Sequence, residues 1–148
     1  MRGDKKMTSR ERINETLNHR QPEGLAIDFG AMRSTGIHIQ AYVELTKALN
    51  LHLSPTKLYD VFQQLALPHP EVIDLFGGDV MQAHQRCPAF GISIEQWRDD
   101  VLDDGTPIMV PRDYQPVPGE DGLHYIYENG VKVAAKPAVG LYYDIIAH

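Results

Sequence analysis

The sequence predicts an α/β protein in which helices follow short buried strands, before an antiparallel β segment. A short apolar run, residues 25–29, closes at Gly30 and precedes a helical pattern over residues 38–49, which together form the beginning of a βα unit. Nearer the carboxyl end, Asn129-Gly130 separates two runs of alternating apolar and polar residues, which is typical of a hairpin with a type I′ turn. These two patterns define the predicted fold class.

Composition and charge exclude several classes of protein. The chain has 148 residues, a formal net charge of -6 and 43% hydrophobic residues, as expected of a globular protein. This acidic balance argues against a nucleic-acid partner, because neutralising phosphates requires a basic surface. No apolar stretch approaches the roughly 20 residues of a membrane helix, so no membrane partner is expected. A single cysteine, Cys87, excludes an internal disulfide and favours a cytoplasmic location.

The first helix is predicted to follow a flexible, charged leader, residues 1–6. Thr8 and Glu11 have the spacing of a capping box, in which each side chain accepts a hydrogen bond from the other residue's backbone amide. Ile13 and Leu17 lie one turn apart and predict the buried side of this helix.

Three more helices and a second strand are expected before residue 88. The helix over residues 38–49 places its apolar residues on one side. The clearest helical spacing in the chain follows it, at i, i+3, i+4 and i+7: Leu58, Val61, Phe62 and Leu65. A short helix then opens at Pro70 and closes at Gly77, and residues 79–83 are predicted to form a strand.

The pattern changes beyond Pro88. Residues 95–135 are interpreted as antiparallel excursions, with the hairpin formed by residues 123–128 and 131–135. The chain then closes on an apolar run, residues 142–148, which we interpret as the interruption of a longer sequence.

Several segments resemble the uroporphyrinogen decarboxylase-like family. The opening of the chain is similar to the amino-terminal opening of that family, at residues 7–12, 17–23 and 26–30. Three later segments resemble a branch related to methylcobalamin-dependent methyltransferases: residues 34–37, 59–66 and 76–80. The resemblance implies the amino-terminal portion of a (β/α)8 TIM barrel with an antiparallel β-hairpin insertion at about residues 95–135. Residues 7–148 would then be a partial barrel domain.

The resemblance implies an activity and leaves two alternatives open. The first expectation is the amino-terminal part of an enzyme for corrinoid-linked methyl transfer. The second is uroporphyrinogen decarboxylase proper, a carboxy-lyase of porphyrin biosynthesis, although His84, Gln85 and Arg86 stand where that enzyme carries an aspartate. The third is a non-catalytic partner chain of a split barrel. Because the remainder of the barrel would be needed, this chain alone is expected to be catalytically inactive.

Four residues are predicted to bind substrate, and no catalytic residue is assigned. The active sites of barrel enzymes lie at the carboxyl ends of the strands, which selects Asp28, Arg33, Ser34 and His84 here. Within the resemblance, Arg33 lies where the decarboxylase holds substrate carboxylates, and a guanidinium suits a carboxylate because it binds with two parallel hydrogen bonds. Asp28 would orient Arg33 or neutralise it.

No metal site or cofactor is predicted within this chain. His84 and Cys87 are three residues apart, but a zinc site needs three or four ligands and no second cysteine exists. The resemblance implies zinc and a corrinoid for the full-length enzyme. The expected partner is a small-molecule substrate or a corrinoid protein.

Overall fold

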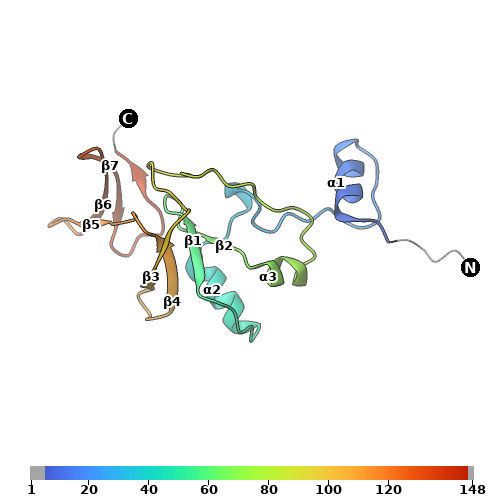
Figure 1. Ribbon diagram of the computed structural model, residues 1–148, viewed down its shortest axis with the longest axis horizontal. Helices are drawn as coiled ribbons and strands as arrows, with labels where there is room; N and C mark the ends of the chain where they lie inside the picture. Colours follow the sequence, from blue (N-terminus) through green and yellow to red (C-terminus); the bar gives the residue numbers. More distant parts are fainter. Residues whose placement is uncertain (1–5, 147–148) are drawn as a thin grey trace, which may run out of the picture.

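The computed structural model describes residues 6–146 and shows two four-stranded sheets with three short helices (Figure 1). The helices are α1 (Ser9–Leu17), α2 (Ile39–Ala48) and α3 (Pro70–Leu75), and η1 (Arg33–Thr35) is a single 3-10 turn. The strands of the first sheet are β1 (Thr56–Asp60), β2 (Leu65–Leu67), β3 (Trp97–Val101) and β4 (Pro107–Pro111). The strands of the second sheet are β5 (Val117–Pro118), β6 (Leu123–Glu128), β7 (Val131–Pro137) and β8 (Asp144–Ile145).

The first sheet has the strand order β2-β1-β4-β3. β1 pairs with β4 in parallel, with Thr56 opposite Ile108, and the other two pairs are antiparallel. The helix α2 packs against β1 and β2. After β2 the chain leaves the sheet through α3 and a long segment, and it returns at β3.

The second sheet is entirely antiparallel, in the order β5-β6-β7-β8. The predicted hairpin is confirmed, because β6 and β7 pair directly across Asn129 and Gly130. Both turn residues have positive φ, 50° and 79°, as a type I′ turn requires. Figure 1 shows this sheet at the end of the molecule opposite α1.

The predicted barrel portion is wrong. The two segments expected as barrel strands, residues 25–29 and 79–83, form no strand, so no βα unit opens the chain. They meet at one point, where the Ile27 amide donates to Asp79 Oδ2 (2.9 Å) and the Asp79 amide donates to the Ile27 carbonyl (2.8 Å). A short apolar run becomes a strand only when neighbouring strands supply its hydrogen bonds, and here the neighbours lie elsewhere.

The helix predicted over Leu58 and Leu65 is also wrong. These residues lie on the antiparallel strands β1 and β2. β1 is covered on both faces, so its apolar residues do not alternate with polar ones and their spacing imitates that of a helix. The turn between the strands is held by Asp60, whose Oδ1 accepts from the amides of Phe62 (2.9 Å) and Gln63 (3.0 Å).

The predicted helices α1, α2 and α3 are confirmed. The capping box of α1 is present, with the Glu11 amide donating to Thr8 Oγ1 and the Thr8 amide donating to Glu11 Oε2. The burial predicted for α1 is wrong, however, because the helix has no buried residue and Leu17 is 72% exposed. The predicted leader, residues 1–6, lies outside the described residues except for Lys6.

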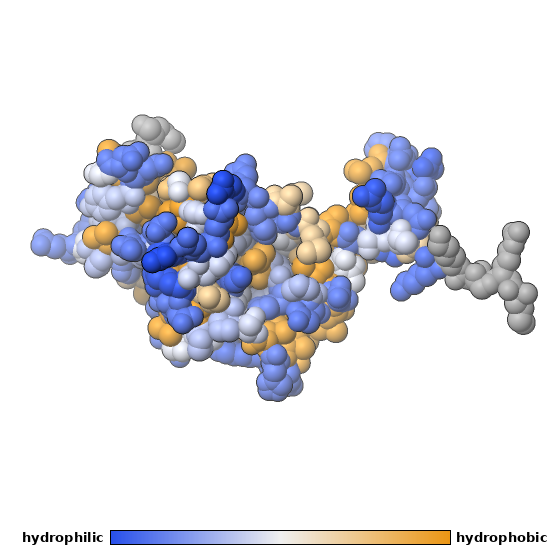
Figure 2. All heavy atoms as spheres, viewed as in Figure 1, coloured by the Kyte–Doolittle hydropathy of each residue, from blue (hydrophilic) through white to orange (hydrophobic). Residues whose placement is uncertain are grey.

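The core lies between α2, the first sheet and the facing side of the second sheet. Its buried members come from every part of the chain after residue 38, and the largest fully buried side chains are Tyr42, Tyr59, Tyr143 and Leu58. Each large apolar side chain buried in this way contributes about 1.5–3 kcal/mol to folding. Figures 1 and 2 show α1 apart from this core, at the end of extended segments beside which apolar side chains are exposed. No helix within residues 6–146 has the length and apolar character to cross a membrane.

Candidate functional site

Arg33 is bound to the protein and does not extend freely from its loop. Its Nε forms an ion pair with Asp60 Oδ2, and its Nη2 donates to the Pro88 carbonyl. The Asp60 side chain is fully buried, whereas that of Arg33 is 42% exposed. The sequence analysis offered Asp28 as the partner of Arg33, but the structure assigns that role to Asp60. A carboxylate inside an apolar run was the available signal, since a buried charge needs a partner.

Asp28 and Ser34 lie in the same loop as Arg33, but within residues 6–146 neither side chain forms a hydrogen bond or ion pair with it. Asp28 Oδ1 accepts from the Ala31 amide (2.7 Å) and closes a turn. Ser34 is exposed in η1. The Asp28 side chain therefore stabilises the loop, and the Ser34 side chain faces solvent.

His84 lies against β1 beside the Arg33 ion pair. Its ring contacts the Tyr59 ring at a centroid separation of 4.9 Å, and burial lowers the pKa of the imidazole. Among residues 6–146, four buried side-chain atoms have no hydrogen-bond partner: the Tyr59 hydroxyl, Asp60 Oδ2, Gln82 Oε1 and His84 Nδ1. Gln82 and His84 line a cavity of about 50 Å³, which is large enough for a bound water that would satisfy them.

Arg33 and His84 thus contact consecutive residues of one strand. We call the set Arg33, Tyr59, Asp60, Gln82 and His84 the loop cluster. No group of three or more His, Cys, Asp or Glu side chains suited to a metal occurs in the described part of the chain, and Cys87 is exposed.

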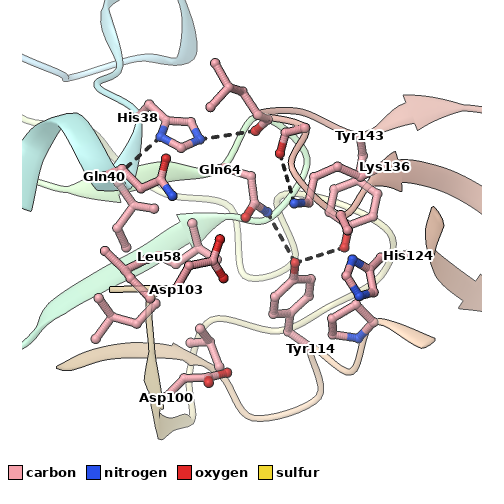
Figure 3. A pocket seen from close by; sticks show the side chains of 18 of the residues that line it. His38, Gln40, Leu58, Gln64, Asp100, Asp103, Tyr114, His124, Lys136 and Tyr143 are labelled. Atoms are coloured by element: carbon pink, nitrogen blue, oxygen red, sulfur yellow. Dashed lines mark hydrogen bonds between the residues drawn. The ribbon is translucent and has the colours of Figure 1, made fainter. Parts of the chain in front are cut away.

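A second and larger cavity, of about 310 Å³, lies between the two sheets (Figure 3). Its walls come from the start of α2, from β1, β3, β4, β6 and β7, and from the segment before β8. Figure 3 shows the labelled polar side chains around this space. They are His38, Gln40, Gln64, Asp100, Asp103, Tyr114, His124, Lys136 and Tyr143. We call it the inter-sheet cavity.

A short chain of hydrogen bonds crosses one wall of the inter-sheet cavity. Gln64 Nε2 donates to the Tyr114 hydroxyl (3.3 Å), which lies 3.1 Å from the Tyr143 hydroxyl. Burial raises the pKa of both phenols. The backbone positions these groups: the Tyr143 amide donates to the Phe62 carbonyl (3.1 Å), and the Tyr114 carbonyl accepts from Arg98 (2.8 Å).

His38 closes another side of the cavity as a neutral imidazole. Its Nδ1 accepts from the Gln40 amide (3.3 Å), so the ring proton is on Nε2, which lies 3.2 Å from the Leu141 carbonyl. Burial lowers the pKa of His38, which agrees with the neutral form. The imidazole therefore caps α2 and ties the segment before β8 to it.

The charged groups around the cavity differ in how far they are satisfied. Asp100 is held by Arg98 (2.9 Å). Lys136 donates to the Gly140 carbonyl (3.0 Å), and burial lowers its pKa. The His124 side chain has no hydrogen-bond partner among residues 6–146, and Asp103 is exposed.

Sequence analysis missed the inter-sheet cavity. Its tyrosines and Lys136 carry no local motif, and they meet only because β7 and the segment before β8 pack onto the β1–β2 turn.

The chain matches no protein-family model, and neither a curated protein nor a solved structure is similar to it.

Proposed function

We propose that this chain is the amino-terminal section of a uroporphyrinogen decarboxylase-like enzyme for corrinoid-linked methyl transfer. The barrel portion is not part of the proposal. The chain would act in the cytoplasm, in keeping with its lone cysteine, and would bind a corrinoid or the protein that carries it.

One observation supports the proposal above the others: segments that resemble the family contact one another in pairs, residues 34–37 with 59–66 and residues 26–30 with 76–80. The Ala66 amide donates to the Ile37 carbonyl (2.9 Å), and the Phe29 and Phe76 rings stack at 4.7 Å. At Gly36 a Cβ would lie 2.5 Å from Leu65, so that approach favours glycine. Segments far apart in the chain are thus brought together in both pairs.

The decarboxylase alternative has less support. Holding a substrate carboxylate would require a free guanidinium, and Arg33 is already paired with Asp60 and Pro88. The guanidinium charge is therefore compensated inside the protein.

The partner-chain alternative is favoured by one feature, the exposure of large apolar side chains. Leu17, Leu25, Met81 and Val139 are 72%, 83%, 75% and 94% exposed. Apolar surface of this kind supports docking to a second chain where it is contiguous.

Zinc does not fit the described residues of this chain. His84 and Cys87 supply two ligands at most, and a zinc site needs three or four. No step through zinc is therefore assigned to these residues, and the role proposed for the chain is binding.

The test is titration of the full chain with methylcobalamin, followed by the absorbance of the corrinoid. His84 is the group to vary, because its ring is partly exposed beside the Arg33 ion pair. The loss of one hydrogen bond worth about 1.4 kcal/mol would weaken binding about tenfold in His84→Ala.

His52→Ala is the matched control, because His52 is exposed. Its affinity for methylcobalamin should equal that of the unmodified chain. The absence of saturable binding, or equal effects of the two substitutions, would reject the proposal. Binding of uroporphyrin in place of methylcobalamin would favour the decarboxylase alternative.

A further inference from the structure

We propose that the inter-sheet cavity is a binding site for a small monocarboxylate with a short apolar chain. One carboxylate oxygen accepts the hydroxyl proton that the Tyr114–Tyr143 pair leaves without an acceptor, and the negative charge faces Lys136. This site is separate from the loop cluster and does not depend on the function proposed above.

The two tyrosine hydroxyls carry one more proton than they have acceptors. The Gln64 amide nitrogen can only donate, so the Tyr114 oxygen is an acceptor in that bond. The two phenols carry two protons, and only one of these can lie between the two hydroxyl oxygens. No other acceptor within residues 6–146 is bonded to either hydroxyl. One hydroxyl proton therefore remains without a partner, whichever way the pair is oriented.

Both tyrosines are buried. Tyr114 and Tyr143 are 6% and 2% exposed. A buried donor without an acceptor costs about 1–3 kcal/mol, so native proteins rarely keep one. Both tyrosines line the inter-sheet cavity, from which an acceptor oxygen would reach them.

The positive charge of Lys136 favours an anionic ligand. The Lys136 ammonium has three donors and uses one, toward the Gly140 carbonyl. His124 adds an imidazole without a side-chain partner in the described part of the chain. The acidic groups are Asp100, which is paired with Arg98, and Asp103, which is exposed to solvent but acts on Lys136 and raises its pKa against the larger effect of burial. The unused hydroxyl proton and the unused Lys136 ammonium protons are donors, and an anion matches them.

Size and wall chemistry define the rest of the ligand. A cavity of about 310 Å³ lies at the lower end of the range of small-molecule sites. Leu58, Ile108 and Val110 form an apolar wall within it. A carboxylate with a short hydrocarbon chain would bury its apolar part against this wall while its oxygens face the donors.

The experiment is calorimetric titration of the full chain with butyrate and with butanamide, its uncharged analogue. Butyrate should bind saturably and more tightly than butanamide, because Lys136 favours the charge. Equal affinities, or no saturable binding of butyrate, would overturn the proposal and assign the cavity to water.

The decisive variant replaces both phenols with phenylalanine, Tyr114→Phe with Tyr143→Phe. A single replacement would leave one hydroxyl able to donate, so both must be removed. The double variant should bind butyrate about tenfold more weakly, the equivalent of 1.4 kcal/mol. Tyr142→Phe is the matched control, because Tyr142 is the neighbouring tyrosine and is 53% exposed. Unchanged affinity in the double variant would overturn the proposal.

A second variant keeps the test valid if the double variant fails to fold. Lys136→Gln should reduce the preference for butyrate over butanamide, whereas Lys132→Gln, on the exposed part of the same strand, should not. Equal preferences in the two lysine variants would contradict the role of Lys136. A chain that binds butyrate but not methylcobalamin would retain this site and refute the corrinoid proposal.

Discussion

The loop cluster and the inter-sheet cavity solve the problem of buried polar groups in opposite ways. In the loop cluster the charged pair is closed: Asp60 Oδ2 is ion-paired with Arg33 and Asp60 Oδ1 accepts from two amides, so the charge of the carboxylate is compensated. In the inter-sheet cavity the Tyr114–Tyr143 pair is open, because one hydroxyl proton has no acceptor in the described residues. Closed pairs stabilise a fold, whereas an open pair is available to a ligand. Arg33, which the sequence suggested as a binding residue, belongs to the closed pair.

The largest expected effect is the loss of stability when the closed pair is broken. Asp60→Asn leaves the half-buried Arg33 without its counter-charge and should lower the free energy of unfolding by about 3 kcal/mol. Urea unfolding of both chains measures the difference. Glu95→Gln is the control, because its ion pair with Arg86 is exposed on both sides and is worth less than about 1 kcal/mol. Similar losses in the two variants would contradict the structural role of Asp60.

A second closed group should make stability depend on pH. Burial alone would raise the pKa of Asp79, but hydrogen bonds from the Ile27 amide and Ser9, with the Arg12 guanidinium, bring it below its ordinary value of 3.8. Because the folded pKa is the lower one, the stabilisation is complete above the unfolded pKa. It is lost as the pH falls through the folded value.

Asp79→Asn should therefore flatten the decline in stability between about pH 5 and about pH 2. Urea unfolding at several pH values measures the slope. Asp99→Asn makes the same charge change on an exposed residue and should leave the slope unchanged. An equal slope in Asp79→Asn and the unmodified chain would show that the ion pair with Arg12 contributes nothing to acid sensitivity.

The smallest expected effect on stability is at the open pair. Tyr143→Phe removes one hydroxyl–hydroxyl bond of 3.1 Å and keeps the buried ring, so it should cost about 1 kcal/mol in unfolding free energy. Thermal or urea unfolding beside Tyr142→Phe provides the comparison. A loss as large as that of Asp60→Asn would mean that the Tyr114–Tyr143 pair stabilises the fold as strongly as the Asp60–Arg33 pair does.

Local patterns predicted the elements whose causes are local. The capping box of α1, the proline start of α3 and the Asn129-Gly130 turn all act within a few residues, and all three elements are present. The prediction failed where distant strands decide. Leu58 and Leu65 have helical spacing but lie on paired strands, because β1 pairs with β4 along one edge and with β2 along the other.

The candidate site shows the same division. Sequence reasoning selected Arg33 and His84, which do contact one strand, but it missed Asp60 as the partner of Arg33. It also had no means of finding Tyr143, whose burial depends on a backbone contact with Phe62 from far along the chain.

By itself, the sequence determined the positions of three helices and of the hairpin, the acidic charge and the lack of an internal disulfide. Only the tertiary structure decided that residues 25–29 and 79–83 are not strands, that Arg33 is neutralised by Asp60, and that two tyrosines face a common cavity. The physical reason is the separation along the chain over which each interaction acts. Caps and turns satisfy backbone groups within one segment, whereas strand pairing, ion pairs and cavities depend on residues brought together by folding.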